Sequence, residues 1–236
     1  MAIRKIPLVK GEYYHIYNRG NSKQVIFLDD EDYSRFIKLL YLCNSKKRVN
    51  FREDIVEKKI DTFDYERGEP IIAIGAWVLM PNHFHLYITE PISPKQGFGD
   101  EEKSAITEFM SKLGTSYSKY FNKKYNRTGK LFEDKFKSIH VDEDIYAKYL
   151  FSYIHLNPIK LIDPRWKESG VKDKNKVLEF LDSYQFSSYQ DFCGIIRSEN
   201  KIIFIKDFPD YFSNGVDFKK EIFDWISFSP KQGFGE

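Results

Sequence analysis

The stretch Ala76-Trp77-Val78-Leu79-Met80-Pro81-Asn82-His83-Phe84-His85-Leu86-Tyr87-Ile88 predicts two apolar strands that fold back on each other at Pro81-Asn82. Side chains alternate between the faces of a strand, so His83 and His85 share one face while Phe84 points into the core. Two neighbouring imidazoles on a rigid strand supply two of the ligands that a metal site needs. The alternative is a pair of ordinary, half-exposed strand histidines in a chain that has five.

Elements of regular structure are expected on either side of this hairpin, in a definite order. A strand is predicted around Tyr13–Asn18, a helix from Asp29 or Asp30, a strand over Ile71–Met80, the histidine strand, a helix from near Glu101, a strand ending at Val141 and a helix ending at Pro158. The first six elements have the order of the split βαβ motif. The expected fold is therefore α+β: a ferredoxin-like sandwich whose antiparallel sheet of four to five strands has helices on one face and an extra helix beyond.

Composition limits the domain organisation and the compartment. The 236 residues suffice for one large domain with an appendage, and we expect a domain over 1–162, with an insertion at about 44–69, and an appendage over 163–236 that packs on it. Neither a membrane span nor a secretory signal is evident, and the two cysteines indicate no disulfide framework. The expected location is the cytoplasm, in association with the nucleoid.

Positive charge is concentrated between Ser111 and His140. The chain carries a net charge of +2, but this stretch alone carries +6, so the other residues sum to −4. Aromatic residues alternate with the cations, which suggests a groove that binds phosphates and stacks unpaired bases. The alternative is a solvated helix with core aromatics. The cations are Lys112, Lys119, Lys123, Lys124, Arg127, Lys130, Lys135 and Lys137, and the aromatics are Tyr117, Tyr120, Phe121, Tyr125, Phe132 and Phe136.

The last predicted helix carries two polar side chains four residues apart, and hence on one face. Tyr153 supplies a phenol, and Asn157 supplies an amide oxygen suited to Mg²⁺ or Mn²⁺. If this helix crosses the histidine strand, His83, His85 and Asn157 can hold a divalent ion beside Tyr153. The alternative is that Tyr153 is a packing residue and that Asn157 caps the helix before Pro158.

Four motifs, taken together, resemble the single-tyrosine transposases of the His-hydrophobic-His superfamily, and most closely the branch of REP-associated tyrosine transposases. They are Arg19-Gly20-Asn21, Ala76–His85, Gly129–Phe132 with Lys135–Ser138, and Tyr153–Pro158, and Ser187-Ser188-Tyr189 resembles a signature that follows the catalytic domain in that branch. The match covers about residues 8–162. The insertion at 44–69 and the tail after 190 have no counterpart that we can align.

The resemblance implies a metal-dependent endonuclease and strand transferase that cleaves and rejoins hairpin-flanked or single-stranded DNA through a 5′-phosphotyrosine. Tyr153 is then the nucleophile, and His83, His85 and Asn157 hold Mg²⁺ or Mn²⁺. Arg19, Asn21 and the cations from Lys112 to Lys137 would bind DNA. The protein would act as a monomer or a homodimer without contacting a membrane. Rival interpretations are a non-catalytic nucleic-acid-binding protein, a replication-initiator nickase and a metal-dependent hydrolase.

A short repeat supports a hairpin substrate. The seven residues Ser93–Gly99 recur as Ser229–Gly235. Their core, Pro-Lys-Gln-Gly-Phe-Gly, can be encoded by CCGAAGCAAGGCTTCGG, in which CCGAAGC pairs with GCTTCGG. We expect both copies to be translated palindromic repeats, and the alternative is chance repetition of a loop sequence. The codons of the gene distinguish the two.

Overall fold

Four antiparallel strands form the central sheet in the computed structural model, which describes residues 7–92, 104–211 and 215–227. The strands are β1 (Tyr13–Arg19), β2 (Ala73–Met80), β3 (His83–Thr89) and β4 (Lys137–Val141), and their order across the sheet is β2-β3-β1-β4. Because β3 lies between β1 and β2, the connection through the first helix crosses over it, as the split βαβ motif requires. The predicted α+β sandwich is confirmed.

The β2–β3 hairpin is the most deeply buried part of the sheet. All eight residues of β2 are buried, as expected for a strand covered on both faces. In β3 the side chains of Phe84 and Leu86 enter the core on one face, whereas Tyr87 enters the core on the other. His83 and His85 lie on the same face as Tyr87, because every second side chain of a strand points to the same face.

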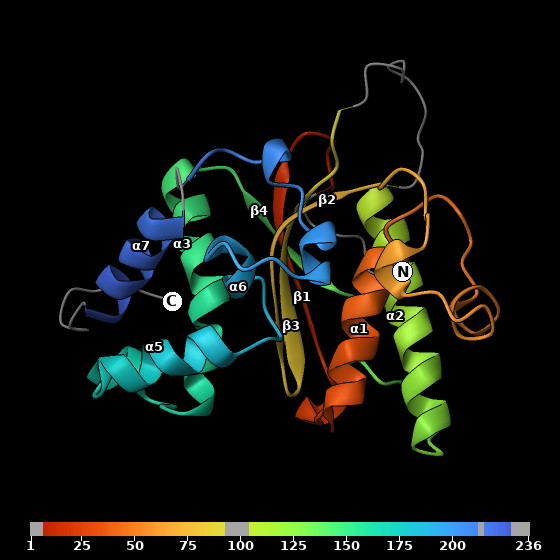
Figure 1. Cartoon of the computed structure of the whole chain (residues 1–236), viewed down its shortest axis with the longest axis horizontal. Helices are drawn as coiled ribbons and strands as arrows, with labels where there is room; N and C mark the ends of the chain where they lie inside the picture. Colours follow the sequence, from red (N-terminus) through yellow and green to blue (C-terminus); the bar gives the residue numbers. More distant parts are fainter. Residues whose placement is uncertain (1–6, 93–103, 212–214, 228–236) are drawn as a thin grey trace.

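Helices α1 (Asp30–Leu42) and α2 (Ala105–Lys124) cover the Phe84 face (Figure 1). Asp29 is the N-cap of α1, and its side chain accepts a hydrogen bond from the amide of Asp32. Aromatic rings fill the space between these helices and the sheet. The rings of Tyr117 and Phe121, on α2, are at most 1% exposed. Two of the six predicted base-stacking aromatics are therefore core residues.

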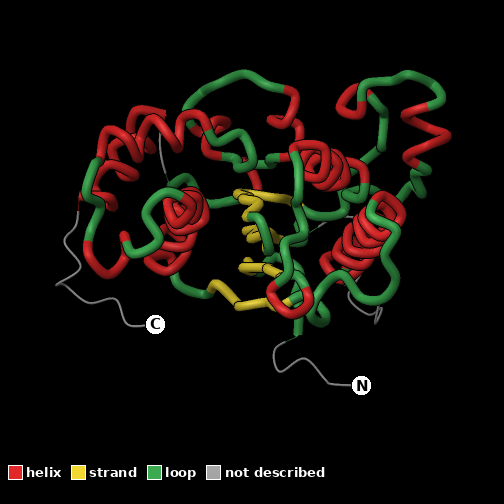
Figure 2. The backbone as a smooth tube through the Cα atoms, turned by 90° about the horizontal axis from the view of Figure 1, so that it is seen from below, coloured by secondary structure: helices red, strands yellow, loops and turns green. Residues whose placement is uncertain are grey.

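The other face of the sheet is covered by α3 (Asp144–Leu156), and the two layers of helices enclose the sheet in the view from below (Figure 2). The remaining α-helices are α4 (Trp166–Ser169), α5 (Lys174–Ser183), α6 (Tyr189–Phe192) and α7 (Gly215–Ser227). Glu143 precedes α3, and no side-chain hydrogen bond caps the helix there. The buried apolar side of α3 packs against β2 in a second core.

The segment before α6 pairs with the outer edge of β2. The amide of Leu79 donates to the carbonyl of Phe186 at 2.9 Å, and the amide of Ser188 donates to the carbonyl of Trp77 at 2.9 Å. The Ser188 hydroxyl accepts from the Trp77 amide at 3.0 Å and lies 2.8 Å from Nε2 of His155 on α3. The Ser-Ser-Tyr segment thus covers a strand edge and ties α3 to it.

The predicted insertion contains two short helical turns. They are a π-helical turn (Phe51–Val56) and a 3-10 turn (Thr62–Asp64). Further 3-10 turns are Asn21–Lys23, Asn157–Leu161, Ser198–Ile202 and Ile205–Asp207. Both copies of the seven-residue repeat lie outside the described residues. Within the described ranges, no helix is both long and apolar enough to cross a membrane.

Candidate active site

His83 and His85 lie side by side on β3, with ring centroids 5.0 Å apart and rings perpendicular. In the strand register, His83 pairs with Arg19 and His85 with Tyr17 of β1. The ring of His83 is held by its neighbour, since its Nδ1 lies 2.6 Å from Oδ1 of Asn82. An amide oxygen can only accept, so Nδ1 carries the proton and Nε2 keeps its lone pair.

Helix α3 places Tyr153 next to this pair. Its ring centroid lies 5.7 Å from that of His85, with the two rings at 82°. The position follows from packing, because Leu150 and Ile154 are buried in the core between α3 and β2. Tyr153 is on the adjoining side of the helix and turns toward the histidine strand. Burial raises the pKa of Tyr153, and the side chain of Asn157 partly offsets this.

Asn157 follows one turn later and ends α3. Its side-chain Nδ2 donates to the carbonyl of Tyr153 at 3.1 Å, so it does cap the helix, as the alternative interpretation held. Its Oδ1, however, is buried and has no hydrogen-bond partner. A buried carbonyl oxygen without a partner is costly in a folded protein, unless something outside the chain binds it. Capping and ligand binding are therefore compatible roles of this side chain.

These donors fit a divalent ion. Two neutral imidazoles and an amide oxygen form the nitrogen and oxygen set that Mn²⁺ and Mg²⁺ accept. Among the described residues, no group of three His, Cys, Asp or Glu side chains is arranged to hold a metal. The buried Oδ1 of Asn157, which has no hydrogen-bond partner, is a candidate third donor beside the two histidines.

The electrostatic environment keeps both imidazoles neutral. Burial, assisted by Lys160 and Arg19, lowers the pKa of His83 to about 4. The pKa of His85 is lowered far below its usual value by burial and then by His15, His83, Lys160 and Lys167. Neutral imidazoles keep a lone pair available for a metal, and the nearby cations attract phosphate.

The sequence did not point to His15, which belongs to this site. Its Nε2 lies 2.8 Å from Nδ1 of His85, and the two rings stack at 25° with centroids 5.0 Å apart. This hydrogen bond engages one ring nitrogen of His85 and leaves Nε2 for a ligand. In the sequence, the alternation of His15 and Tyr17 places both side chains on one face of a strand. That this is the face of His83 and His85 follows only from the pairing of β1 with β3.

Lys167 also joins the site from outside the first 162 residues. It lies on α4, and its Nζ is 4.1 Å from the centroid of the Tyr153 ring. An ammonium group over an aromatic ring is attracted to its face. The segment expected to be an appendage therefore contributes a side chain beside the phenol.

Arg19 and Asn21 lie where the end of β1 meets the turn of the histidine hairpin and the loop before β4. The amide of Gly20 donates to the carbonyl of Asn82, and the amide of Asn21 donates to the carbonyl of Leu131, both at 2.8 Å. Nη2 of Arg19 binds both carboxylate oxygens of Glu133, at 3.0 and 3.1 Å. Arg19 therefore connects the histidine strand to the loop before β4, and its pairing with Glu133 leaves less of its charge for DNA.

The predicted DNA-binding cations divide into two groups. Lys137 lies near the site, with Nζ 6.0 Å from the centroid of the Tyr17 ring, and Lys130 and Lys135 are exposed in the preceding loop. The others lie on or just after α2, across the sheet from Tyr153, so the structure does not bring them to the candidate active site. They are Lys112, Lys119, Lys123, Lys124 and Arg127.

The two cations at the C-terminal end of the second group, Lys124 and Arg127, have partners within the protein. Lys124 forms ion pairs with Asp29, Glu31 and Asp32 at 2.8 to 3.0 Å. The Arg127 guanidinium lies 5.5 Å from the centroid of the Phe121 ring. These contacts attach the end of α2 to the start of α1 and to the core, which is a structural use of both side chains.

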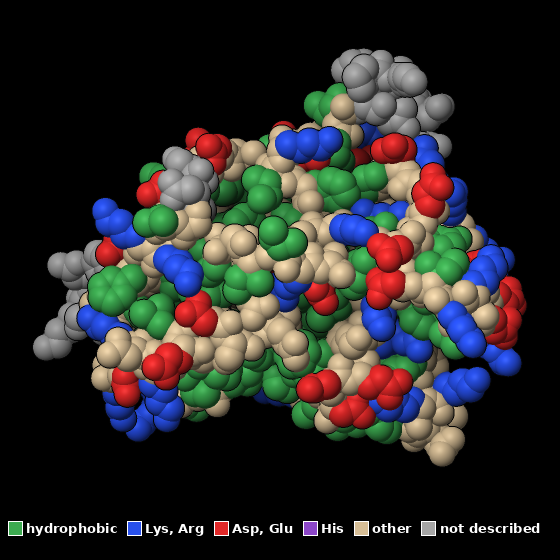
Figure 3. Space-filling view, viewed as in Figure 1, with side chains coloured by type: hydrophobic (Ala, Val, Ile, Leu, Met, Phe, Trp, Pro, Cys, Tyr) green, Lys and Arg blue, Asp and Glu red, His purple; other side chains and the backbone are tan. Residues whose placement is uncertain are grey.

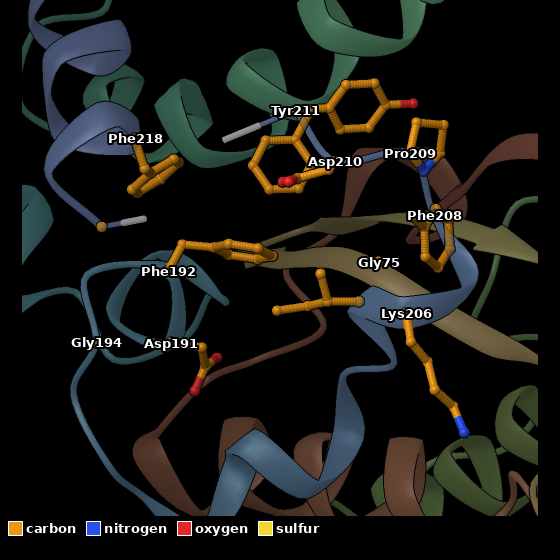
Figure 4. Close-up of a pocket in the computed structure, with 13 residues that line it drawn as sticks. Gly75, Asp191, Phe192, Gly194, Lys206, Phe208, Pro209, Asp210, Tyr211 and Phe218 are labelled. Atoms are coloured by element: carbon orange, nitrogen blue, oxygen red, sulfur yellow. The ribbon is translucent and has the colours of Figure 1, made fainter. Parts of the chain in front are cut away.

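A separate cavity of about 530 Å³ lies beside the edge strand β2 and is surrounded by aromatic rings (Figure 4). The Phe208 ring lies against Gly75, where a Cβ atom would approach it to 2.9 Å. Tyr211, which also lines the cavity, joins its hydroxyl to that of Tyr87 at 2.9 Å. None of the four predicted catalytic and metal-binding residues lines this cavity.

Acid should destabilise the protein through its buried histidines. The folded-state pKa is lowered to about 4 for His15 and His83 and to about 3 for His155. The unfolded chain takes up these protons near pH 6.5, whereas the folded chain does not, so stability is complete above pH 6.5 and falls toward pH 4. Urea unfolding without metal at pH 7, 6 and 5 should show a decreasing free energy of unfolding. Equal values at pH 7 and 5 would contradict this.

Comparisons with known proteins give a weak structural likeness. No family model matches the chain, and no curated protein matches it in sequence. A solved structure described as a REP-associated tyrosine transposase bound to a REP hairpin aligns over 84% of this chain and 90% of its own. The identity is 15% and the TM-score is 0.45. A likeness of this size does not establish a common function.

Proposed function

We propose that the protein is a metal-dependent single-strand DNA endonuclease and strand transferase of the transposase type. One observation carries the proposal: a tyrosine on α3 lies against a pair of neutral histidines on β3, next to a buried amide oxygen without a partner. The motif resemblance is a second line of support for this proposal, because it assigns roles to the same four side chains from the sequence alone.

The covalent step follows from the phenol. Oη of Tyr153 attacks the scissile phosphorus in line, and the bond between phosphorus and the 3′-oxygen breaks. The products are a 5′-phosphotyrosine and a free 3′-hydroxyl, with the phenol proton transferred in net terms to the departing oxygen. Attack by another 3′-hydroxyl reverses the step and joins new strands without a nucleotide cofactor. The bond energy is conserved in the phosphotyrosine.

A bound Mg²⁺ or Mn²⁺ would polarise the scissile phosphate and offset charge in the transition state. His83, His85 and Asn157 would hold it, and His15 and Asn82 would orient the two imidazoles through their Nδ1 atoms. Lys160, Lys167 and Lys137 would attract the DNA backbone to this face. A phenol with a pKa near 10 is a poor nucleophile at neutral pH, and burial disfavours its charged form further, so such electrostatic help is needed.

The substrate in this proposal is single-stranded or hairpin DNA. In-line attack needs an accessible, unpaired phosphodiester, because the phenol belongs to a helix held against the sheet. One nucleophilic tyrosine per chain means that paired cleavages need either two chains or two rounds, so a monomer and a homodimer are both compatible. The proposed place of action is the nucleoid.

The test is covalent capture. Purified protein is incubated with 5′- and 3′-labelled hairpin DNA from the flanks of its own gene, with Mn²⁺, Mg²⁺ or chelator, and resolved on a denaturing gel. We expect a metal-dependent protein–DNA adduct that carries only the label on the 3′ side of the break. Binding without an adduct on any flanking hairpin would replace this proposal with a non-catalytic DNA-binding protein. Cleavage without an adduct would indicate a hydrolase.

A further inference from the structure

A buried hydrogen bond holds the tyrosine helix from the side opposite Tyr153. Nε2 of His155, on α3, lies 2.8 Å from the hydroxyl oxygen of Ser188, which directly precedes α6. Two residues that are two positions apart in an α-helix are separated by about 200° around its axis. Helix α3 therefore contacts the histidine strand through Tyr153 on one side and Ser188 through His155 on the other.

Ser188 is itself fixed to the sheet. Its amide donates to the carbonyl of Trp77 on β2 at 2.9 Å, and its hydroxyl oxygen accepts from the amide of Trp77 at 3.0 Å. Strand β2 pairs in turn with β3, where Met80 lies opposite His83. The backbone of the sheet thus connects the support behind α3 to the strand that carries the histidine pair.

The surroundings of His155 are otherwise aromatic. Three phenylalanine rings have their centroids 4.7 to 5.3 Å from that of His155. They belong to Phe151 on α3, Phe192 on α6 and Phe218 on α7. An apolar side chain would fill such a space without the cost of removing an imidazole from water. A polar group in an apolar core can instead serve to fix one alignment of the packed elements.

Little water reaches this hydrogen bond. His155 and Ser188 are both 0% exposed, and over α6 the surface drawn in Figure 3 is mostly backbone and uncharged side chains. In such an environment a hydrogen bond is stronger than in water, and a partner left alone would be buried without compensation. The pair therefore favours the one orientation of α3 in which both partners are satisfied.

A reacting phenol needs a directional restraint of this kind. The packing of Leu150 and Ile154 against β2 holds α3 on the sheet, but hydrophobic burial has no preferred direction. A hydrogen bond, by contrast, weakens steeply when its angle changes. Because misplacing a reacting group by about 1 Å can cost on the order of 100-fold in rate, a small rotation of α3 matters for attack.

We propose that His155 and Ser188 are positioning residues, which fix the rotation of α3 so that the phenol of Tyr153 faces the histidine pair. The consequence for catalysis rests on the proposed function, whereas the consequence for geometry does not. The Ser-Ser-Tyr segment, which the proposed chemistry does not use, thereby gains a role. So does the imidazole that lies between Tyr153 and Asn157 in the sequence.

The test uses two pairs of matched variants. His155→Gln keeps a polar group that can reach Ser188, whereas His155→Met has the same length without an amide, and both lose the ring. Ser188→Ala deletes the hydroxyl, and Ser187→Ala makes the same change at a buried neighbour whose hydroxyl accepts from the amide of Tyr189 at 3.3 Å. Melting temperatures verify that every variant is folded at the assay temperature.

The first measurement is the rate of adduct formation at saturating hairpin DNA and Mn²⁺. His155→Met and Ser188→Ala should be at least tenfold slower than the wild type, with DNA affinities within twofold of it. His155→Gln should be rescued to within threefold of the wild-type rate, and Ser187→Ala should match it equally well. A role in packing alone would slow the Gln and Met variants alike. Equal rates for these two, or for the two alanine variants, would overturn the proposal.

The second measurement does not depend on any reaction. A nuclear Overhauser effect between the rings of Tyr153 and His85, whose centroids are 5.7 Å apart, reports the orientation of α3 in the free protein. It should persist in His155→Gln and Ser187→Ala and weaken in His155→Met and Ser188→Ala. If the wild type forms no adduct, the proposed function fails, but this contact still tests the positioning. An unchanged contact in His155→Met would overturn the inference.

Discussion

Replacing Tyr153 by phenylalanine should abolish the covalent protein–DNA adduct while leaving DNA binding within about twofold of the wild type. The substitution removes only the phenolic oxygen, which is the attacking atom in the proposed reaction. Folding should be preserved because the ring and its contacts with His85 and Lys167 remain. The denaturing gel with labelled hairpin DNA and Mn²⁺ measures the adduct, and anisotropy measures binding.

A neighbouring tyrosine provides the matched control. Tyr149 lies one turn earlier on α3, and its ring centroid is 5.9 Å from that of Tyr153. Tyr149→Phe makes the same chemical change on the same helix and should retain the adduct. If Tyr153→Phe forms the adduct as well as the wild type does, or if only Tyr149→Phe loses it, then Tyr153 is not the nucleophile.

Removing the imidazole of His83 or His85 should lower the rate of adduct formation by about 10²-fold or more, because each substitution deletes a proposed ligand of the ion that polarises the phosphate. Each variant should also bind Mn²⁺ more weakly, which isothermal titration measures without DNA. The Mn²⁺ affinity and the rate of adduct formation should decrease together. A variant with unchanged Mn²⁺ affinity and lost activity would show that the histidine acts in some other way.

His140→Ala is the control for these variants. His140 lies on β4, where its Nε2 is 2.8 Å from a carboxylate oxygen of Glu12, away from the proposed ligands. The variant should keep both Mn²⁺ binding and adduct formation. Wild-type activity in excess chelator should match that of the His83 and His85 variants, and full activity in chelator would refute a metal-dependent reaction.

The order of elements and the hairpin were predictable because both depend on local patterns. Alternating bulky residues identify β1, and apolar runs identify β2 and β3. Helical spacing identifies α1, α2 and α3, and Pro81-Asn82 marks the turn. The parity of β3 also determines that His83 and His85 share a face, whichever partner strands surround it. The shared side of Tyr153 and Asn157 likewise follows from helical periodicity.

Local patterns did not predict whether a charged or aromatic side chain packs inside the protein or lies on a binding surface. The periodic pattern over α2 is compatible both with a core helix and with a nucleic-acid groove. Packing decided between these for Tyr117 and Phe121, which are buried, and pairing decided for Lys124, which contacts three carboxylates. Such contacts join residues that are distant in sequence, so no local window contains them.

By itself, the sequence determined the α+β fold, the hairpin with its two histidines and the candidate tyrosine, since periodicity and turn chemistry act over a few residues. Only the tertiary structure decided that His15 supports His85, that Lys167 reaches the tyrosine ring, and that His155 on α3 contacts Ser188 beside β2. The physical reason is that strand register and helix packing bring together residues whose separation along the chain carries no signal of their contact.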